Sequence, residues 1–276
     1  MSADLSVSLT ALGVGLAVVL AVMTAGFTSA KRTERLTIVD TLWPLGFVAV
    51  GLASALVSLT GDTDPVLPWI LAGLTAIWGL RLARYLHRRN HGKDEDPRYA
   101  ELAEQDGRSF AEVALKRVFG PQGVAMYLVA TPLMVGAGTQ DPLWWLVGIG
   151  VAVWLLGFVF ESVGDAQLAR FKADPSNQGQ LMDQGLWRYT RHPNYFGDAC
   201  VWAGLWLVAA SSWAGVATAF SPIAMAFFLT KVTGAANNEK GMKKSKPGYD
   251  DYVRRTSGFI PGSPTKARQR RLPGRG

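Results

Sequence analysis

Residues 142–160 read PLWWLVGIGVAVWLLGFVF, an apolar run without a charged side chain. A helix of about 20 such residues crosses the hydrocarbon core of a bilayer. Six further runs meet or approach this length: 6–28, 38–60, 66–86, 124–138, 194–210 and 213–231. We therefore predict an all-α integral membrane protein with seven transmembrane helices and a tight turn at Ser211–Ser212. Because the run 124–138 is short, six spans remain an alternative.

The composition excludes several other classes of protein. Hydrophobic residues make up 49% of the chain and charged residues only 18%, whereas soluble domains carry about 25% charged residues. The single cysteine, Cys200, excludes an intramolecular disulfide framework. The three histidines are too few for the histidine-rich di-iron clusters of many membrane oxygenases, and we expect neither a metal ion nor a nucleic-acid partner.

The basic residues predict the orientation of the spans, because Lys and Arg concentrate in cytoplasmic loops. All 28 fall in four segments, 31–35, 81–117, 170–191 and 231–275. The alternate segments carry only aspartates: Asp4, Asp62, Asp64 and Asp141. Seven spans with the N-terminus outside and the C-terminus in the cytoplasm fit this pattern, and we expect a bacterial inner membrane protein.

The chain organisation is simple in this interpretation. The first run resembles a signal peptide, but Asp4 and the absence of Lys or Arg before it favour an uncleaved first helix. We predict one membrane domain over residues 1–262, followed by a basic disordered tail over residues 263–276. The tail is typical of a segment that rests on anionic lipid.

A stripe of arginines marks the end of the third run. Arg81, Arg84, Tyr85 and Arg88 follow the i, i+3, i+4, i+7 spacing of one helical face. Guanidinium groups suit phosphates, and inside a membrane they need a partner or a water-filled cavity. Ordinary extension of these side chains to the interface is the alternative. His87 and His91 lack a clear third ligand for a metal.

Carboxylates recur near two other spans. Glu161, Asp165 and Lys172 lie close to one face of a helix, where a structural network of ion pairs is the alternative to a ligand site. Asp40 lies at the start of the second run. It is either a carboxyl group that faces a substrate cavity or the partner of Arg35 or a loop lysine.

Residues 185–198, GLWRYTRHPNYFGD, form the sharpest cluster. Pro193 suits the first turn of a helix, where its missing N–H has no cost. That helix would present Arg191, Asn194, Tyr195 and Asp198 on one face, beside the unpaired N–H groups of its first turn. Helix capping alone is the structural alternative. Residues 236–261 predict either an amphipathic interfacial helix or a lid over a cytoplasmic pocket.

The stretch from Gly185 to Asp198 and the ending from Tyr249 to Pro261 resemble the C-terminal domain of the steroid 5-alpha-reductase family. The resemblance implies seven membrane helices around NADPH, which enters from the cytoplasm, and a lipophilic enone substrate from the bilayer. It places the cofactor-binding half at about residues 120–262.

The resemblance also implies roles for individual residues. Asn194 and Asp198 would contact the cofactor, with Asp198 in place of the more usual Glu, and Asp165 and Lys172 would hold its ribose and phosphate end. The complete cofactor-binding set that we predict is Arg81, Arg84, Arg88, Asn90, Arg98, Asp165, Lys172, Arg191, His192, Asn194, Tyr195 and Asp198. The family's catalytic Glu and Tyr have no clean match, and the candidates are Asp40 for the acid and Tyr85 for the phenol.

We therefore expect an NADPH-dependent membrane reductase of a lipophilic conjugated C=C bond. A rival resemblance is to the isoprenylcysteine carboxyl methyltransferase group, which binds S-adenosylmethionine and shares the RHPxY pattern of residues 191–195. A non-catalytic lipid-binding membrane protein is the third alternative. The chain lacks the GxGxxG motif of soluble dinucleotide-binding domains, which does not separate these alternatives.

Overall fold

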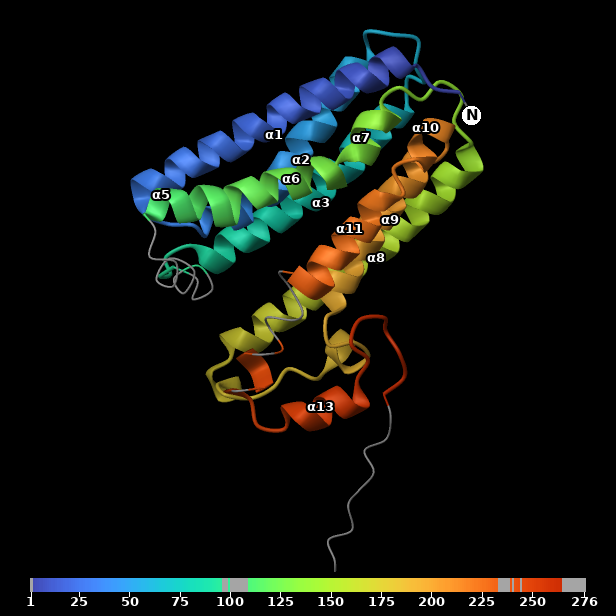
Figure 1. Ribbon diagram of the computed structural model, residues 1–276. Helices are drawn as coiled ribbons and strands as arrows, with labels where there is room; N and C mark the ends of the chain where they lie inside the picture. Colours follow the sequence, from blue (N-terminus) through green and yellow to red (C-terminus); the bar gives the residue numbers. More distant parts are fainter. Residues whose placement is uncertain are drawn as a thin grey trace, which may run out of the picture. The chain divides into compact units, whose positions relative to one another are not determined.

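The computed structural model describes residues 2–95, 99, 109–232, 239, 241–243 and 245–264. Within these residues the chain is helical, with two isolated β-bridges and no β-strand (Figure 1). The all-α prediction is thus confirmed. The chain divides into two compact units. The first unit contains Met1–Ala152 and Ala203–Ala224, and the second contains Val153–Trp202 and Met225–Gly276.

The first unit is a bundle of long helices. Helix α1 (Leu5–Thr33) and helix α3 (Leu67–Asn90) both pack against α2 (Ile38–Ser58). A nearly continuous helical stretch from Phe110 to Gly136 packs on α1 and comprises α5 (Phe110–Val113), a π-helical turn (Ala114–Phe119), α6 (Gly120–Val129) and α7 (Thr131–Gly136). The fourth run is therefore part of a longer helical stretch than its hydropathy predicts.

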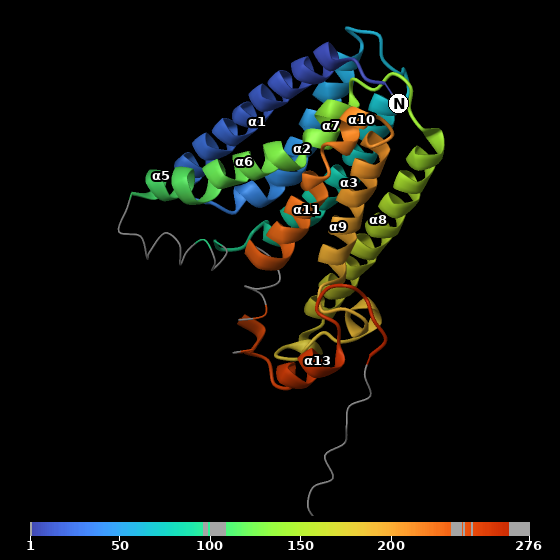
Figure 2. The same ribbon diagram turned by 45° about the vertical axis from the view of Figure 1, so that its right-hand side comes forward.

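Two helices belong partly to each unit. Helix α8 (Trp144–Ala173) and helix α9 (Pro193–Ala209) run side by side in both views (Figures 1 and 2). After α9 the chain forms α10 (Trp213–Val216), α11 (Phe220–Phe227) and a second π-helical turn (Phe228–Val232). The second unit also contains two 3₁₀ turns, Pro175–Asn177 and Gly185–Arg188, and α13 (Tyr249–Arg255).

Helix ends follow the chemistry expected from the sequence. Asp4 caps α1 by accepting hydrogen bonds from the N–H groups of Ser6 and Val7. Helix α9 begins at Pro193, as predicted. The predicted turn at Ser211–Ser212 is also present, because Ser212 caps the next helix through a hydrogen bond from the N–H of Gly215 at 3.2 Å.

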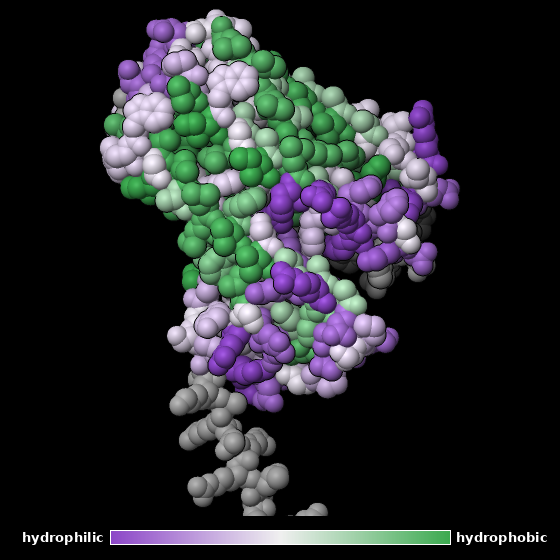
Figure 3. Space-filling view, turned by 180° about the vertical axis from the view of Figure 1, so that it is seen from behind, coloured by the Kyte–Doolittle hydropathy of each residue, from purple (hydrophilic) through white to green (hydrophobic). Residues whose placement is uncertain are grey.

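Within the described residues, five helices are long and apolar enough to cross a membrane: Leu5–Thr33, Ile38–Ser58, Phe110–Gly136, Trp144–Ala173 and Trp213–Lys231. Their outer surfaces are apolar, as Leu9, Trp145 and Ile223 illustrate with exposed fractions of 67%, 65% and 70%. Figure 3 shows a broad apolar surface of this kind. A large exposed apolar surface is typical of a protein that lies in lipid.

The other two predicted runs also form helices. Helix α3 ends in arginines and histidine, and α9 has only 17 residues. The count of seven spans and the orientation of the termini therefore stay predictions. So does the single domain over residues 1–262, and most of the predicted tail lies outside the described residues.

Glycines bring α8 and α9 into backbone contact. A Cβ atom on Gly157 would lie 2.5 Å from the carbonyl oxygen of Gly197, and one on Gly197 would lie 2.4 Å from the backbone nitrogen of Glu161. A Cβ on Gly150 would lie 2.9 Å from the carbonyl oxygen of Gly204. Small residues at such interfaces allow membrane helices to approach closely. This approach positions the polar ends of α8 and α9 against each other.

Candidate functional site

The polar ends of α8 and α9 form a buried cluster in the second unit. Glu161, Asp165 and Asp198 are buried, with exposed fractions of 3%, 4% and 8%. The amide Nδ2 of Asn194 donates a hydrogen bond to Oδ1 of Asp165 at 3.2 Å. Since a carboxylate accepts only from the NH₂ side of an amide, this bond fixes the orientation of the Asn194 side chain.

The carbonyl oxygen of Asn194 differs from its amide nitrogen. Oδ1 of Asn194 is buried and has no hydrogen-bond partner among the described residues. A buried acceptor without a partner is costly, and such atoms call for an explanation such as a ligand. The cluster therefore presents a fixed acceptor, Oδ1 of Asn194, to which no described residue donates.

A second group precedes the start of α9. Oε1 of Glu239 accepts a hydrogen bond from Nε of Arg191 at 2.9 Å and lies 3.0 Å from Nε2 of the buried His192. The His192 ring stacks on that of Tyr195, with centroids 5.4 Å apart and an interplanar angle of 14°. Glu239 thus connects two residues of the RHPNY motif to a segment more than 40 residues later.

Arg191 makes further contacts that fix this part of the chain. Its Nη1 donates to the carbonyl oxygen of Thr256 at 2.9 Å, near the C-terminus of α13. Its backbone N–H donates to the carbonyl oxygen of Ser257 at 2.9 Å. Cations near a helix C-terminus are stabilising. In the structure, the guanidinium of Arg191 therefore binds protein groups.

Aromatic side chains anchor the same region to α8. The indole N–H of Trp187 donates to the carbonyl oxygen of Gly164 at 3.1 Å, and the hydroxyl of Tyr252 donates to the carbonyl oxygen of Trp187 at 2.5 Å. Both side chains are buried. The ending from Tyr249 to Pro261 thus packs against residues 187–191.

Burial shifts the pKa values of these groups. Burial lowers the pKa of His192 below its ordinary value, and the hydrogen bond to Glu239 opposes this shift only in part. Burial acts to raise the pKa of Glu239, but the hydrogen bonds from Arg191 and His192 outweigh it, and the net pKa is lowered. Burial raises the pKa of Tyr249 to about 12. His192 is therefore a neutral hydrogen-bonding group near pH 7.

The first unit contains a different cluster around Asp40. Its Oδ2 accepts hydrogen bonds from Nη2 of Arg89 at 3.1 Å and from Nδ2 of Asn90 at 3.2 Å. Its Oδ1 accepts from the hydroxyl of Tyr99 at 2.9 Å. The carbonyl oxygen of Asn90 accepts from Nε of Arg89 at 3.0 Å. Asp40 therefore pairs with Arg89, and both ends of the Asn90 amide are occupied.

The loop after α3 also holds the start of α2. The carboxylate of Glu95 accepts hydrogen bonds from the backbone N–H groups of Leu36 and Thr37, at 2.5 and 3.0 Å. Nη2 of Arg35 donates to the carbonyl oxygen of Lys93 at 2.6 Å. The bonds to Glu95 satisfy the N–H groups of the two residues that directly precede α2. The Asp40 cluster is thus supported from two sides.

The predicted site residues divide between the units. Asp40, Arg81, Arg84, Tyr85, Arg88 and Asn90 lie in the first unit, and Asp165, Lys172, Arg191, His192, Asn194, Tyr195 and Asp198 lie in the second. Arg84, Arg88 and Lys172 are exposed, whereas Arg81 and Tyr85 are half-buried. Arg98 lies outside the described residues. The functional assignments of all these residues stay predictions.

Two residues with direct contacts to the site were missed by the sequence reasoning. Glu239 lies in a strongly basic segment, and Tyr99 follows a run of charged residues that is typical of a solvated loop. They are identified only by contacts between distant residues. Glu239 lies 47 residues from its partner His192, and Tyr99 lies 59 residues from its partner Asp40. Among the described residues, no group of three or more His, Cys, Asp or Glu is arranged to hold a metal ion.

The chain is similar to known proteins over part or most of its length. Over 74 residues the chain is 36% identical to steroid 5-alpha-reductase DET2 of Arabidopsis thaliana, a stretch that covers 26% of this chain and 28% of that protein. The match thus spans little more than a quarter of the relative's length. It supports the predicted steroid-reductase-like family. No solved structure matches the chain. A family described as a protein of unknown function (DUF1295) matches residues 26–256, and the chain belongs to this family.

Proposed function

We propose that the chain is a membrane-embedded, NADPH-dependent reductase of a lipophilic conjugated C=C bond. The observation that carries the proposal is the buried carbonyl oxygen of Asn194, which has no partner among the described residues. A ligand that donates a hydrogen bond would satisfy this oxygen, and the carboxamide NH₂ of a nicotinamide is such a donor. The similarity to a protein named as a steroid 5-alpha-reductase supports the same chemistry.

The residues of the second unit fit this cofactor in their chemistry. Asn194 would accept from the carboxamide, and Asp165 keeps the Asn194 amide in the required orientation. Asp198 and Asp165 are carboxylates of the kind that accept from ribose hydroxyls. The exposed Lys172 is a cation suited to phosphates. When bound, NADPH would supply the hydride for the reduction.

Other side chains would act on the substrate. We propose that Asp40 and the phenol of Tyr99, which donates a hydrogen bond to it, polarise the substrate carbonyl and supply the proton. This proposal adds Tyr99 to Tyr85 as a candidate phenol, because Tyr99 donates a hydrogen bond to Asp40. The ion pair with Arg89 and the bond from Asn90 hold the carboxylate in place.

We also propose how the chain lies in the membrane. Seven spans, with the N-terminus outside and the C-terminus in the cytoplasm, place all 28 basic residues on one side of a bacterial inner membrane. The five apolar helices support a membrane location. In this orientation Lys172, Arg191 and the end of α3 face the cytoplasm, where NADPH is available.

Thermal stabilisation of the detergent-purified chain tests the proposal. NADPH, NADH and S-adenosylmethionine are added separately, since a ligand that binds only the folded state raises the melting temperature. We expect stabilisation by NADPH and not by S-adenosylmethionine. Stabilisation by S-adenosylmethionine alone would replace the reductase with a methyltransferase. No stabilisation by any of the three would favour a non-catalytic lipid-binding protein.

A further inference from the structure

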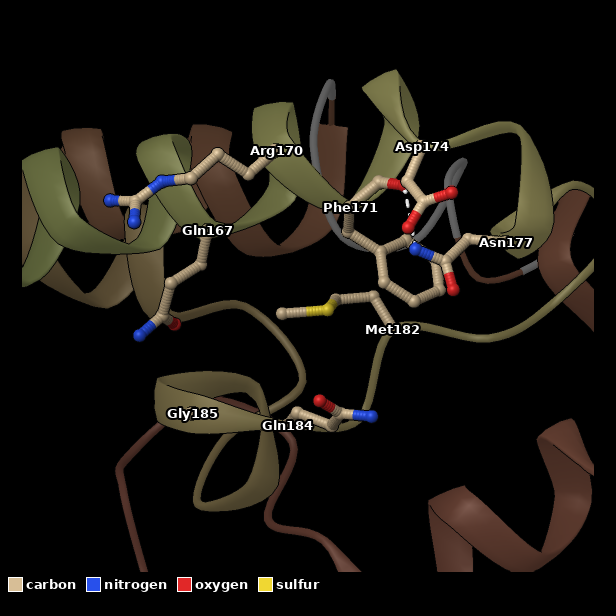
Figure 4. A pocket seen from close by; sticks show the side chains of 8 residues that line it. All are labelled: Gln167, Arg170, Phe171, Asp174, Asn177, Met182, Gln184 and Gly185. Atoms are coloured by element: carbon tan, nitrogen blue, oxygen red, sulfur yellow. Dashed lines mark hydrogen bonds between the residues drawn. The ribbon is translucent and has the colours of Figure 1, made fainter.

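The C-terminal end of α8 borders a pocket in the second unit. Its volume is about 390 Å³, within the range of about 300–1,000 Å³ that is common for small-molecule sites. It is open to the surface, and Figure 4 shows the side chains that line it. The lining residues are Gln167, Arg170, Phe171, Asp174, Asn177, Met182, Gln184 and Gly185.

This pocket does not belong to the proposed cofactor site. On an α-helix, Gln167 and Arg170 lie about 140–200° around the axis from Asp165. Lys172 lies within about 20° of Asp165 by the same geometry. The pocket therefore uses the opposite face of α8.

The depth of the pocket follows from the length of α8. This helix has 30 residues and spans about 45 Å, whereas the hydrocarbon core of a bilayer is about 30 Å thick. Trp144 and Trp145 are exposed at its first turn and mark one interface. A core of about 30 Å that begins at Trp144 would end about 20 residues later, near Val163. Gln167 and the residues after it would then lie at the level of the lipid headgroups.

The pocket carries opposite charges at its two ends. Figure 4 shows Arg170 and Asp174 at opposite ends, with Phe171 and Met182 between them. No hydrogen bond or ion pair engages the Arg170 guanidinium within the described part of the chain. Oδ1 of Asp174 accepts from the N–H and the hydroxyl of Ser176, at 2.9 and 2.7 Å. These bonds hold the pKa of Asp174 below its ordinary value, so the group is ionised.

We propose that this pocket binds the phosphoethanolamine headgroup of a membrane phospholipid. Arg170 binds the phosphodiester, because a guanidinium donates two parallel hydrogen bonds to phosphate oxygens. Asp174 accepts from the ammonium group, and Phe171 and Met182 contact the ethylene and glycerol carbons. The open side leaves the acyl chains in the bilayer. A purely anionic headgroup would instead be repelled by Asp174.

Native mass spectrometry of the full chain tests this site. The protein is titrated with phosphatidylethanolamine, phosphatidylglycerol and phosphatidylcholine that carry the same acyl chains. We expect a preference for phosphatidylethanolamine of about two- to fivefold, the size typical of exposed ion pairs. Equal retention of the three lipids, or a preference for phosphatidylglycerol or phosphatidylcholine, would overturn the proposal.

Three variants locate the site. Asp174→Asn keeps the hydrogen bonds from Ser176 but should abolish the preference for phosphatidylethanolamine over phosphatidylglycerol, and Arg170→Gln should weaken retention of both. Arg188→Gln, an exposed arginine of the same unit, is the matched control and should behave like the unmodified chain. An unchanged preference in Asp174→Asn with native helical content would exclude this pocket.

A free metabolite with the same chemistry is the remaining source of a ligand. Soluble glycerophosphoethanolamine is therefore added to the protein stripped of lipid. We expect it to bind far more weakly than the lipid, because it lacks the acyl chains that anchor the lipid beside the pocket. Binding as tight as that of the lipid would reassign the pocket to a water-soluble ligand.

Discussion

The Asp40 and Asp165 clusters contain the same pair of groups and use it differently. In each, an asparagine Nδ2 donates to an aspartate oxygen at 3.2 Å. The carbonyl oxygen of Asn90 accepts from Arg89, whereas that of Asn194 is buried without a partner among the described residues. The Asn90 amide therefore holds protein groups in place, and the Asn194 amide is available to a ligand.

The largest expected effect concerns chemistry at the Asp40 cluster. Asp40→Asn and Tyr99→Phe should each lower turnover about a hundredfold, because they remove the groups proposed for general acid catalysis. The measurement is NADPH oxidation with a panel of lipophilic enones that includes a steroid 4-en-3-one. Stabilisation by NADPH should remain unchanged.

Tyr85→Phe is the matched control for Tyr99→Phe. It should lower turnover less than Tyr99→Phe does, since Tyr99 donates a hydrogen bond to Asp40. A large loss in Tyr85→Phe with full activity in Tyr99→Phe would restore Tyr85 as the catalytic phenol.

The next effect concerns the helix contact that builds the Asp165 cluster. Gly197→Ala would place a Cβ 2.4 Å from the backbone nitrogen of Glu161, so α8 and α9 must separate. Such overpacking typically costs about 1–3 kcal/mol, and the melting temperature should fall. Gly148 also lies in α8, but a Cβ added there meets nothing within 4 Å. Gly148→Ala should therefore increase the free energy of unfolding by up to about 1 kcal/mol, because alanine has the higher helix propensity. Equal shifts in both variants would contradict the close backbone contact.

The pH dependence should reveal the buried His192 beside this cluster. Its folded pKa lies below the ordinary value of 6.5, so the unfolded chain binds more protons between these two values. The free energy of unfolding should therefore fall as pH decreases from 7 through 6.5 toward the folded pKa. Melting curves of the unmodified chain and of His192→Gln check this expectation. His192→Gln should flatten the profile, and the exposed His91→Gln should not.

The smallest effect is expected at Glu239. Glu239→Gln keeps an acceptor for Arg191 and His192 but removes the charge, and both partners of the Arg191 ion pair are partly exposed. The loss should be about 1 kcal/mol or less. Glu112→Gln removes a more exposed partner, that of Lys116, and should change the melting temperature less. A larger loss in Glu112→Gln would contradict the role of Glu239.

Local features of the fold could be predicted from the sequence. Pro193 starts a helix and Ser212 caps one, because both effects act within a few residues. The fourth helix was harder to predict, since Glu112, Lys116 and Arg117 interrupt its hydropathy although they remain helical. Hydropathy indicates which part of a helix contacts lipid, whereas the helix itself continues as long as its backbone hydrogen bonds do.

Pairings between distant segments could not be predicted in this way. Gly150, Gly157 and Gly164 recur every seven residues, as do Gly197 and Gly204, but such a pattern acquires meaning only when the partner helix is known. The spacing predicted that Asn194 and Asp198 share a face with Arg191. In the structure Arg191 binds Glu239 and the end of α13, a partner that no local pattern indicates.

The central claim is that the Asn194 amide binds the cofactor, whereas the Asn90 amide, which the sequence assigned to the cofactor-binding set, is occupied at both ends by Arg89 and Asp40. Equilibrium binding of NADPH to the unmodified chain, Asn194→Ala and Asn90→Ala tests it most directly. The account predicts that Asn194→Ala raises the Kd about tenfold or more, the effect of one lost buried hydrogen bond, while Asn90→Ala leaves it nearly unchanged. An unchanged Kd in Asn194→Ala, or an equal rise in both variants, would contradict the account.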